Sequence, residues 1–194
     1  KDIEVNGLNL CNRTTEYSSI LSYVTGEKYI ENIRNNTSIK ALVLSPDLLN
    51  CYQQNLDREI TYLVVQDPEI TFYKIHEYLY NETDFYDKFD FESTTGTNCS
   101  IHNSSIVEKG VIIGNNVVIG PNSVIKKGSV LEDNVIIGCN TTIGSEGFQI
   151  IEFKKKRQKI THTGGVLLKK NTFIADNTAI CNSLFEGHTI IDEG

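Results

Sequence analysis

Aliphatic residues recur at every sixth position through the second half of the chain. The run holds eight such positions without a miss: Ile101, Val107, Ile113, Ile119, Ile125, Leu131, Ile137 and Ile143. Small or β-branched residues stand four positions after the first seven of them: Ser105, Val111, Val117, Ser123, Ser129, Val135 and Thr141. A helix repeats every ~3.6 residues and a strand every ~2, so neither produces this pattern. The period instead predicts three short strands per coil of about eighteen residues, with each aliphatic side chain stacked on its equivalent in the next coil.

Glycine and asparagine separate the aliphatic pairs, as in "GVIIGNNVVIGPNSVI" (110–125). We expect them to supply the turns, because both tolerate a positive φ: Gly114, Asn115, Asn116, Gly120, Gly138, Asn140 and Gly144. An Ile- and Val-rich set of sandwich strands is the alternative, but it does not require a six-residue period. The pattern therefore predicts a left-handed parallel β-helix.

The first half of the chain has a different pattern. The apolar runs 40–45 and 61–66 predict short strands, and "PDLLNCYQQN" (46–55) predicts a short helix with Pro in its first turn. A longer helix is predicted over 67–80, with Asp67 as N-cap and Pro68 at the first helical position. The acidic and aromatic stretch 81–98 reads as a link. We therefore expect an α/β domain over residues 1–96 and the β-helix over 97–194.

The six-residue period is interrupted twice. Residues 145–165 break it, and it resumes at Leu168, Ile174 and Ile180 before slipping again at "CNSLFEGH" (181–188). A β-helix can extrude a loop at a corner without disturbing its stack, and loops on rigid scaffolds commonly carry function. The alternative for 145–165 is a solvated surface excursion.

Charge and cysteine content narrow the classes of protein. A net charge of −7 and a pI near 5.1 argue against nucleic-acid binding, which requires a basic footprint. Five widely spaced cysteines without a CxxC pair indicate reduced thiols in a cytoplasmic protein. No apolar run approaches eighteen residues and no signal peptide is present, so we expect no membrane insertion. Because the chain lacks Met and stops within the repeat, we expect it to be trimmed or incomplete at its C-terminus.

The order of these segments resembles the UDP-3-O-acylglucosamine N-acyltransferases, a family of hexapeptide-repeat acyltransferases. The resemblance rests on "IGSEGF" (143–148), the interruption that follows it, and "GGVLLKKNTFIADNTAI" (164–180). The stretch "VQDPEITFYKI" (65–75) is similar to the family's N-terminal Pro-x-Leu-Thr-Tyr helix. The resemblance implies transfer of an acyl group from acyl-coenzyme A or acyl carrier protein to a nucleotide-linked amino sugar, in lipid A or surface-polysaccharide synthesis.

The same resemblance implies where the sugar nucleotide binds. "LSYVTGEKY" (21–29) is similar to the family's uridine-binding stretch, in which two aromatic residues six apart hold the base. The matching residues are Tyr23 and Tyr29, with Lys28 beside them. The family has Asn where this chain has Gly26, and the family's catalytic His would fall beyond Gly194. A relative that acylates a dTDP-amino-deoxyhexose is therefore a second interpretation.

Acylation of an amine by a thioester requires a group that accepts the amine proton, and His is the usual choice. The chain has four histidines: His76, His102, His162 and His188. We expect His76 to be structural and His102 to lie on the solvated outer face. His162 and His188 stand beside the two interruptions and are the candidate bases, although either could instead anchor a loop. Glu146 occupies the family's acidic position in "SEGF" and is expected to orient the amine or a His.

Five basic residues lie within the first interruption: Lys154, Lys155, Lys156, Arg157 and Lys159. On an acidic protein they suggest a grip on the phosphates of coenzyme A or on the acidic surface of acyl carrier protein. Lys155, Lys156 and Arg157 are the central candidates, and the coil faces near Asn140 and Asp176 are further candidates for the donor site. An exposed, solvated loop is the alternative.

Three other functions remain open at this point. The same scaffold could serve as a coenzyme A-dependent O-acyltransferase or as a non-catalytic binding and assembly module. A carbonic-anhydrase-like metal site would need three His at a shared interface, and these four are not so spaced, so we expect no metal. We expect a homotrimer, because three-fold packing can bury the apolar surface that a slipped coil leaves open.

Overall fold

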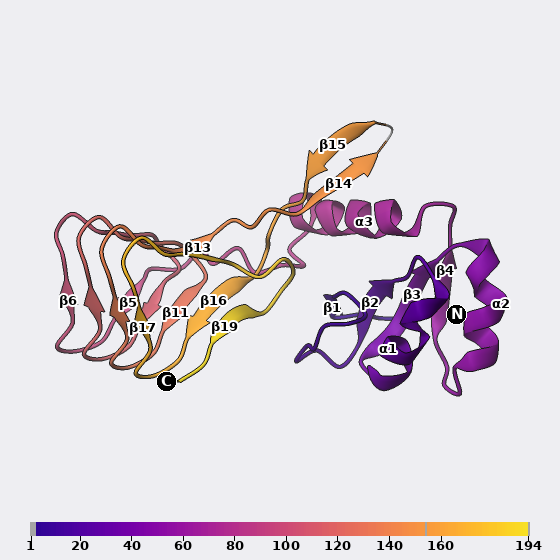
Figure 1. Cartoon of the computed structure of the whole chain (residues 1–194), viewed down its shortest axis with the longest axis horizontal. Coiled ribbons are helices and arrows are strands. Elements are labelled where there is room, and N and C mark those ends of the chain that lie inside the picture. Colours follow the sequence, from indigo (N-terminus) through magenta and orange to yellow (C-terminus); the bar gives the residue numbers. More distant parts are fainter. Residues whose placement is uncertain (1–2, 154, 194) are drawn as a thin grey trace. The chain divides into compact units, whose positions relative to one another are not determined.

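The computed structural model describes residues 3–153 and 155–193, which fall into two compact units (Figure 1). The first unit runs to Phe85 and also includes Ile150–Ile160. The second contains Tyr86–Gln149 and the chain from Thr161 onward. Each unit has its own hydrophobic core.

The first unit is a four-stranded parallel sheet with helical crossovers. Strands β1 (Gly7–Leu8), β2 (Ile20–Tyr23), β3 (Ile39–Leu44) and β4 (Thr61–Val64) lie side by side in chain order. The short helices η1 (Glu27–Tyr29) and α1 (Ile30–Asn35) connect β2 to β3, α2 (Pro46–Asn55) connects β3 to β4, and α3 (Pro68–Glu82) follows β4. Both longer helices carry Pro at their start, where its missing N–H has no cost.

A half-buried arginine, Arg58, connects several segments of this unit. The guanidinium of Arg58 donates four hydrogen bonds to backbone carbonyls, those of Ile33 (2.6 Å), Asn36 (2.7 Å), Ile39 (2.9 Å) and Thr37 (3.1 Å). Burial lowers the pKa of this guanidinium from its ordinary value. The carbonyls lie at the end of α1 and the start of β3, so Arg58 caps the helix and fixes the turn into the strand.

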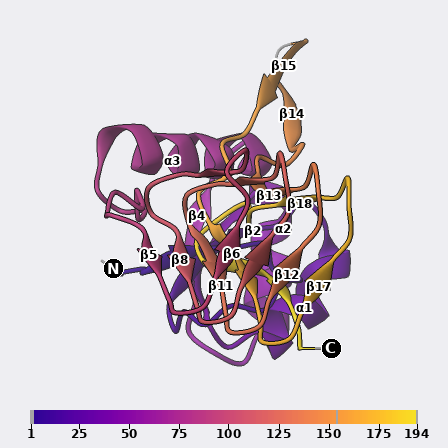
Figure 2. The same ribbon diagram turned by 90° about the vertical axis from the view of Figure 1, so that its left-hand side faces the viewer.

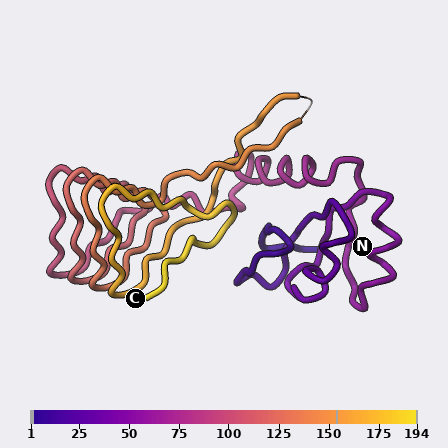
Figure 3. The backbone as a smooth tube through the Cα atoms, viewed as in Figure 1, coloured from indigo at the N-terminus to yellow at the C-terminus, as the bar shows by residue number. Residues whose placement is uncertain are grey.

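The second unit is a parallel β-helix. Its first two coils contain β5 (Thr94–Thr95), β6 (Ser100–Ile101), β7 (Ile106–Val107), β8 (Ile112–Ile113), β9 (Val118–Ile119) and β10 (Val124–Ile125). The later coils contain β11 (Ser129–Leu131), β12 (Ile136–Ile137), β13 (Thr142–Ser145), β16 (Gly165–Leu168), β17 (Phe173–Ile174), β18 (Ala179–Cys181) and β19 (His188–Ile191). Figures 2 and 3 show the coils repeating one behind the next.

Three parallel sheets form the sides of the stack, in the orders β19-β16-β11-β8-β5, β17-β12-β9-β6 and β18-β13-β10-β7. Ile113 pairs with Leu131, eighteen positions later, and Leu131 pairs with Leu168 across the first interruption. The predicted inward positions are buried from Ile113 to Ile143, whereas Ile101 in the first coil is 37% exposed. The six-residue period therefore marks the inward side chains, as predicted.

The turns differ from the prediction in how glycine is used. Positive φ occurs at Asn98, Asn116, Asn122, Asn134, Asn140, Asn171 and Asn177. Gly114, Gly120 and Gly138 are not in the left-handed region. A side chain on any of them would collide with the adjacent coil; at Gly138 a Cβ would overlap Oδ1 of Asp176 and lie 2.6 Å from its backbone nitrogen. Asparagine supplies the left-handed turns, and these three glycines permit the close approach of neighbouring coils.

The start of the β-helix and the structure of its first interruption also differ from expectation. The first coil begins at Thr94, inside the stretch expected to be a link. The first interruption is not an irregular loop, because it contains an antiparallel hairpin of β14 (Ile150–Phe153) and β15 (Lys156–Lys159). Ile151 and Ile160 are buried and Nζ of Lys74 on α3 lies 4.5 Å from the Phe153 ring centroid, so the hairpin packs within the first unit.

Candidate functional site

The two interruptions of the β-helix pack against each other. The chain returning from the hairpin, residues 161–164, lies beside the second excursion, residues 182–187. Backbone hydrogen bonds join Thr163 N to Leu184 O (3.2 Å), Gly164 N to Ser183 O (3.1 Å) and Asn182 N to Ser145 O (2.9 Å). Leu184 and Phe185 are 4% and 2% exposed, so the excursion contributes to a core. We call this packed region, residues 145–147, 162–165 and 182–188, the junction.

His162 lies inside the junction in a defined orientation. Its Nδ1 atom is 3.1 Å from the backbone oxygen of Asn182. A carbonyl oxygen only accepts, so the proton of the neutral ring is on Nδ1 and the lone pair is on Nε2. Nε2 is buried and has no hydrogen-bond partner among the described residues. A buried acceptor without a partner is unfavourable, and active sites are one place where such groups are kept.

Gly147 and Asn182 hold the imidazole in place. A methyl group on Gly147 would overlap Cε1 of His162 and lie 2.8 Å from Nε2, so only glycine lets the backbone approach the ring. The amide of Asn182 donates to the carbonyl oxygens of Gly164 (3.0 Å) and His162 (3.4 Å). Neither residue was among the sequence candidates. The only sequence feature that could have pointed to Gly147 and Asn182 was the break in the six-residue period at the two interruptions.

The other two junction candidates lie nearer the surface. His188 begins β19, is exposed, and pairs with Gly165, where an added Cβ would lie 2.9 Å from Cδ2 of His188. Glu146 is exposed and directly precedes Gly147. The structure thus brings His162, His188 and the backbone beside Glu146 into one region.

The remaining histidines have local roles. His76 is fully buried on α3. His102 is exposed, and its Nδ1 lies 2.9 Å from Oγ of Ser104 and 3.2 Å from the Ser104 nitrogen. Ser104 in turn accepts a hydrogen bond from Asn122 N in the next coil, so this pair belongs to a turn.

The candidate nucleotide-binding residues occupy separate surroundings in the first unit. The Tyr23 ring packs against Phe72 and Tyr73, with centroids 4.9 Å and 5.9 Å away, and its hydroxyl donates to Oε1 of Glu69 at 3.1 Å. Burial, together with neighbouring Tyr73 and Glu69, raises the pKa of Tyr23 far above its ordinary value. Tyr29 is half-buried, and Nζ of Lys28 lies 5.0 Å from its ring centroid.

The candidate donor-binding residues divide between the two units. Lys155, Lys156 and Arg157 are exposed on the hairpin, and Lys154 lies outside the described residues. Glu152 is the cross-strand neighbour of Arg157, so part of the charge is offset locally.

Asn140 and Asp176 lie in the second unit, at one corner of the β-helix. Asn140 has φ 52°, and Oδ1 of Asp176 accepts a hydrogen bond from Cys139 N at 2.6 Å. Both side chains are exposed. Asn140 therefore shapes the turn, and the side chain of Asp176 joins neighbouring coils.

The described residues contain neither a metal-binding cluster nor a membrane-spanning helix. Among residues 3–153 and 155–193, no group of three or more His, Cys, Asp or Glu side chains is arranged to hold a metal ion. In the same part of the chain, no helix has both the length and the apolar character needed to cross a bilayer. All five cysteines are free thiols.

One known family model matches the repeat of the β-helix. The model of the bacterial transferase hexapeptide family (six repeats) matches residues 92–127 and 110–145. No curated protein sequence matches the chain significantly. The matched residues run from the first coil to the point where the hairpin excursion begins. Residues 92–145 therefore match the hexapeptide repeat of bacterial transferases, and the family suggests acyl or acetyl transfer.

Proposed function

We propose that this protein is an N-acyltransferase that moves an acyl group from a thioester donor to the amino group of a nucleotide-linked amino sugar. The observation that carries the proposal is the orientation of His162 in the junction. Its Nδ1 is committed to the Asn182 carbonyl and its Nε2 is left as an acceptor. The hexapeptide match supports acyl transfer as the reaction class.

The reaction needs one proton acceptor and one leaving group. The amine nitrogen attacks the thioester carbonyl carbon, and Nε2 of His162 takes the proton that the nitrogen loses. The carbon–sulfur bond then breaks, and the departing sulfur receives that proton to give a thiol and an amide. A positioned base of this kind contributes about 10²–10⁴-fold to the rate.

Access to Nε2 depends on the segment that covers it. The backbone of Gly147 lies against the ring, so proton transfer requires residues 146–148 to move aside when substrate binds. Glu146 is exposed beside this glycine and would orient the incoming amine. His188, on the exposed side of the junction, is the second candidate base.

The proposal includes the two substrates and a homotrimer. Tyr23, Lys28 and Tyr29 would contact the nucleotide, and the basic hairpin would contact coenzyme A or acyl carrier protein. The outer faces of two sheets carry exposed apolar side chains: Ile112, Val118, Ile136, Phe173 and Ile190. Two adjacent apolar faces on a prism suit a cyclic arrangement in which each face meets a different copy.

Mass spectrometry of reaction products tests the proposal. The protein is incubated with a panel of UDP- and dTDP-linked amino sugars, each with acyl-coenzyme A and with acyl carrier protein thioesters. We expect one pair to yield a product whose acyl group resists hydroxylamine, as an amide does. A hydroxylamine-labile ester would contradict N-acylation, and no product from any pair would contradict the enzyme assignment.

A further inference from the structure

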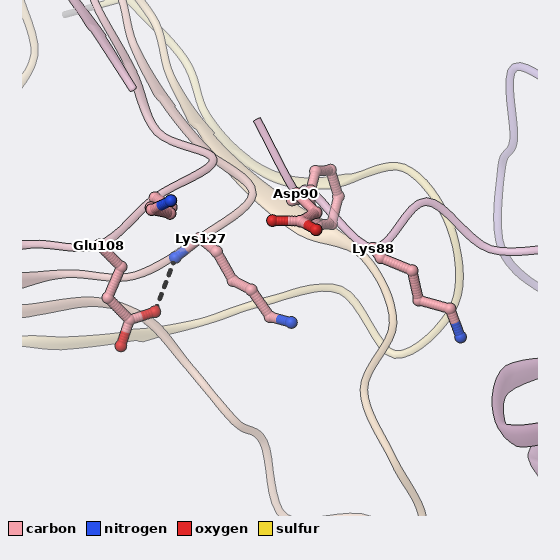
Figure 4. Close-up of a pocket in the computed structure, with 6 residues that line it drawn as sticks. Lys88, Asp90, Glu108 and Lys127 are labelled. Carbon is pink, nitrogen blue, oxygen red and sulfur yellow. Dashed lines mark hydrogen bonds between the residues drawn. The ribbon is translucent and has the colours of Figure 1, made fainter. Parts of the chain in front are cut away.

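A hollow of about 340 Å³ lies at one corner of the β-helix, lined by residues that the proposed reaction does not use (Figure 4). Its lining residues are Lys88, Phe89, Asp90, Glu108, Lys109 and Lys127. They come from the segment before the first coil and from the turns that follow β7 and β10. All six belong to the second unit.

Phe89, which lines this hollow, has an unusual backbone conformation. Its φ is 51°, in the left-handed region that bulky side chains rarely adopt. Its backbone and Cβ occupy the space that a side chain on Gly110 would need, and its Cε2 lies 2.8 Å from where a Gly128 Cβ would be. Both glycines have positive φ, 77° and 75°. An outlier supported by two glycines is typical of a segment whose position matters for function.

The hollow presents charges of both signs at fixed places. Oε2 of Glu108 accepts a hydrogen bond from Lys127 N at 3.0 Å, and Nζ of Lys109 lies 2.7 Å from Oε1 of Glu92. In Figure 4 the side chains of Lys88 and Lys127 extend on either side of Asp90. Three ammonium groups and two carboxylates therefore line the hollow, on a chain whose net charge is −7.

We propose that this corner hollow binds a small phosphorylated sugar. A phosphate monoester carries about −1.5 to −2 charges at neutral pH and matches the lysines. A bare anion would leave Asp90 and Glu108 opposed to it, whereas sugar hydroxyls donate hydrogen bonds to carboxylates. The volume is at the lower end of the range for ligand pockets, about 300–1,000 Å³, and suits a monosaccharide phosphate. This inference does not depend on the proposed acyl transfer.

Isothermal titration calorimetry at low salt tests the inference on the whole chain. We expect glucose 1-phosphate to bind with a submillimolar Kd, and glucose or inorganic phosphate to bind at least tenfold more weakly. Lys88→Gln and Lys127→Gln should each weaken glucose 1-phosphate about tenfold. Asp90→Asn should weaken glucose 1-phosphate without changing the binding of inorganic phosphate.

Lys170→Gln is the matched control, because the Lys170 backbone also donates to a glutamate, Oε2 of Glu132 at 3.0 Å, but the residue does not line the hollow. It should bind like the wild type. Thermal melting of every variant should match the wild type, which shows that the fold is retained. Absence of binding, equal affinity for inorganic phosphate and glucose 1-phosphate, or an equal effect of Lys170→Gln and Lys127→Gln would each overturn the proposal.

Discussion

Nδ1 of His162 lies 3.1 Å from the backbone oxygen of Asn182, although the two residues belong to different interruptions of the β-helix. The contact therefore exists only when both excursions leave and re-enter the stack in register. It fixes the ring tautomer, and the backbone of Gly147 lies against the same ring.

The basic hairpin should affect the acyl donor and not the acceptor. We choose Lys156→Glu/Lys159→Glu, because reversing Arg157 would place two glutamates opposite each other at Glu152. Exposed charge contacts contribute about 0.2–1 kcal/mol each, so the donor KM should rise about three- to tenfold at low salt. The acceptor KM should stay unchanged, and the salt dependence of the rate should flatten.

Arg13→Glu/Lys170→Glu makes the same change in net charge at exposed positions away from the hairpin. It should leave the donor KM at the wild-type value. If both double variants raise the donor KM equally, the hairpin acts only through the overall charge of the protein.

The apolar outer faces should hold the trimer together. Ile136→Glu/Phe173→Glu introduces two charges on one face, at side chains that are 43% and 65% exposed. Light scattering at micromolar concentration should give a trimer for the wild type and a monomer for the variant. Phe148→Ser is the control, because this ring is 88% exposed but lies outside the sheets, and it should remain trimeric. A monomeric wild type would refute the proposed assembly.

Gly138→Ala should destabilise the β-helix by about 2–3 kcal/mol. The added methyl overlaps Oδ1 of Asp176, which cannot retreat without losing its hydrogen bond to Cys139 N. Urea denaturation measures the change. Gly26→Ala is the comparison, since no atom lies within 4 Å of the new methyl, and it should change stability by less than about 1 kcal/mol. Similar losses of unfolding free energy in both variants would show that the close approach of the next coil is not the reason for glycine at position 138.

Tyr23 should make the first unit sensitive to alkaline pH. Burial raises the pKa of Tyr23 above its ordinary value of 10.0, and it raises the pKa of neighbouring Tyr73 as well. The unfolded chain loses these protons near pH 10 while the folded chain retains them, so stability is complete below pH 10 and falls as the pH rises above it. Tyr23→Phe should reduce this fall in denaturant titrations at pH 9–11. An unchanged pH dependence would show that Tyr23 is not the titrating group.

The β-helix could be predicted from the sequence because every inward position carries the same requirement. Stacked coils repeat one buried environment, so Ile113, Leu131 and Ile137 are each independent evidence for the same inward-facing position. The helices α2 and α3 were also predictable, since Pro46 and Pro68 mark their first turns. By contrast, β2 spans only four residues and α1 only six, too few for a period to be recognised.

The site was only partly predictable, for a physical reason. His162 and His188 could be selected as candidates because each stands beside a break in the period. The roles of Gly147 and Asn182 depend on contacts with His162 from fifteen and twenty residues away, which no local pattern encodes. The hairpin was missed because the sequence between its two strands lacks the Asn-Gly or Asp-Gly pair typical of tight hairpins.

The turnover number of His162→Gln, measured with the sugar nucleotide and donor identified by mass spectrometry, tests the central claim most directly. Glutamine retains much of the size and hydrogen bonding of His but cannot accept the proton, so kcat should fall about 10²–10⁴-fold. His102→Gln, at an exposed turn, should retain wild-type kcat. A kcat for His162→Gln within about threefold of wild type would contradict the account.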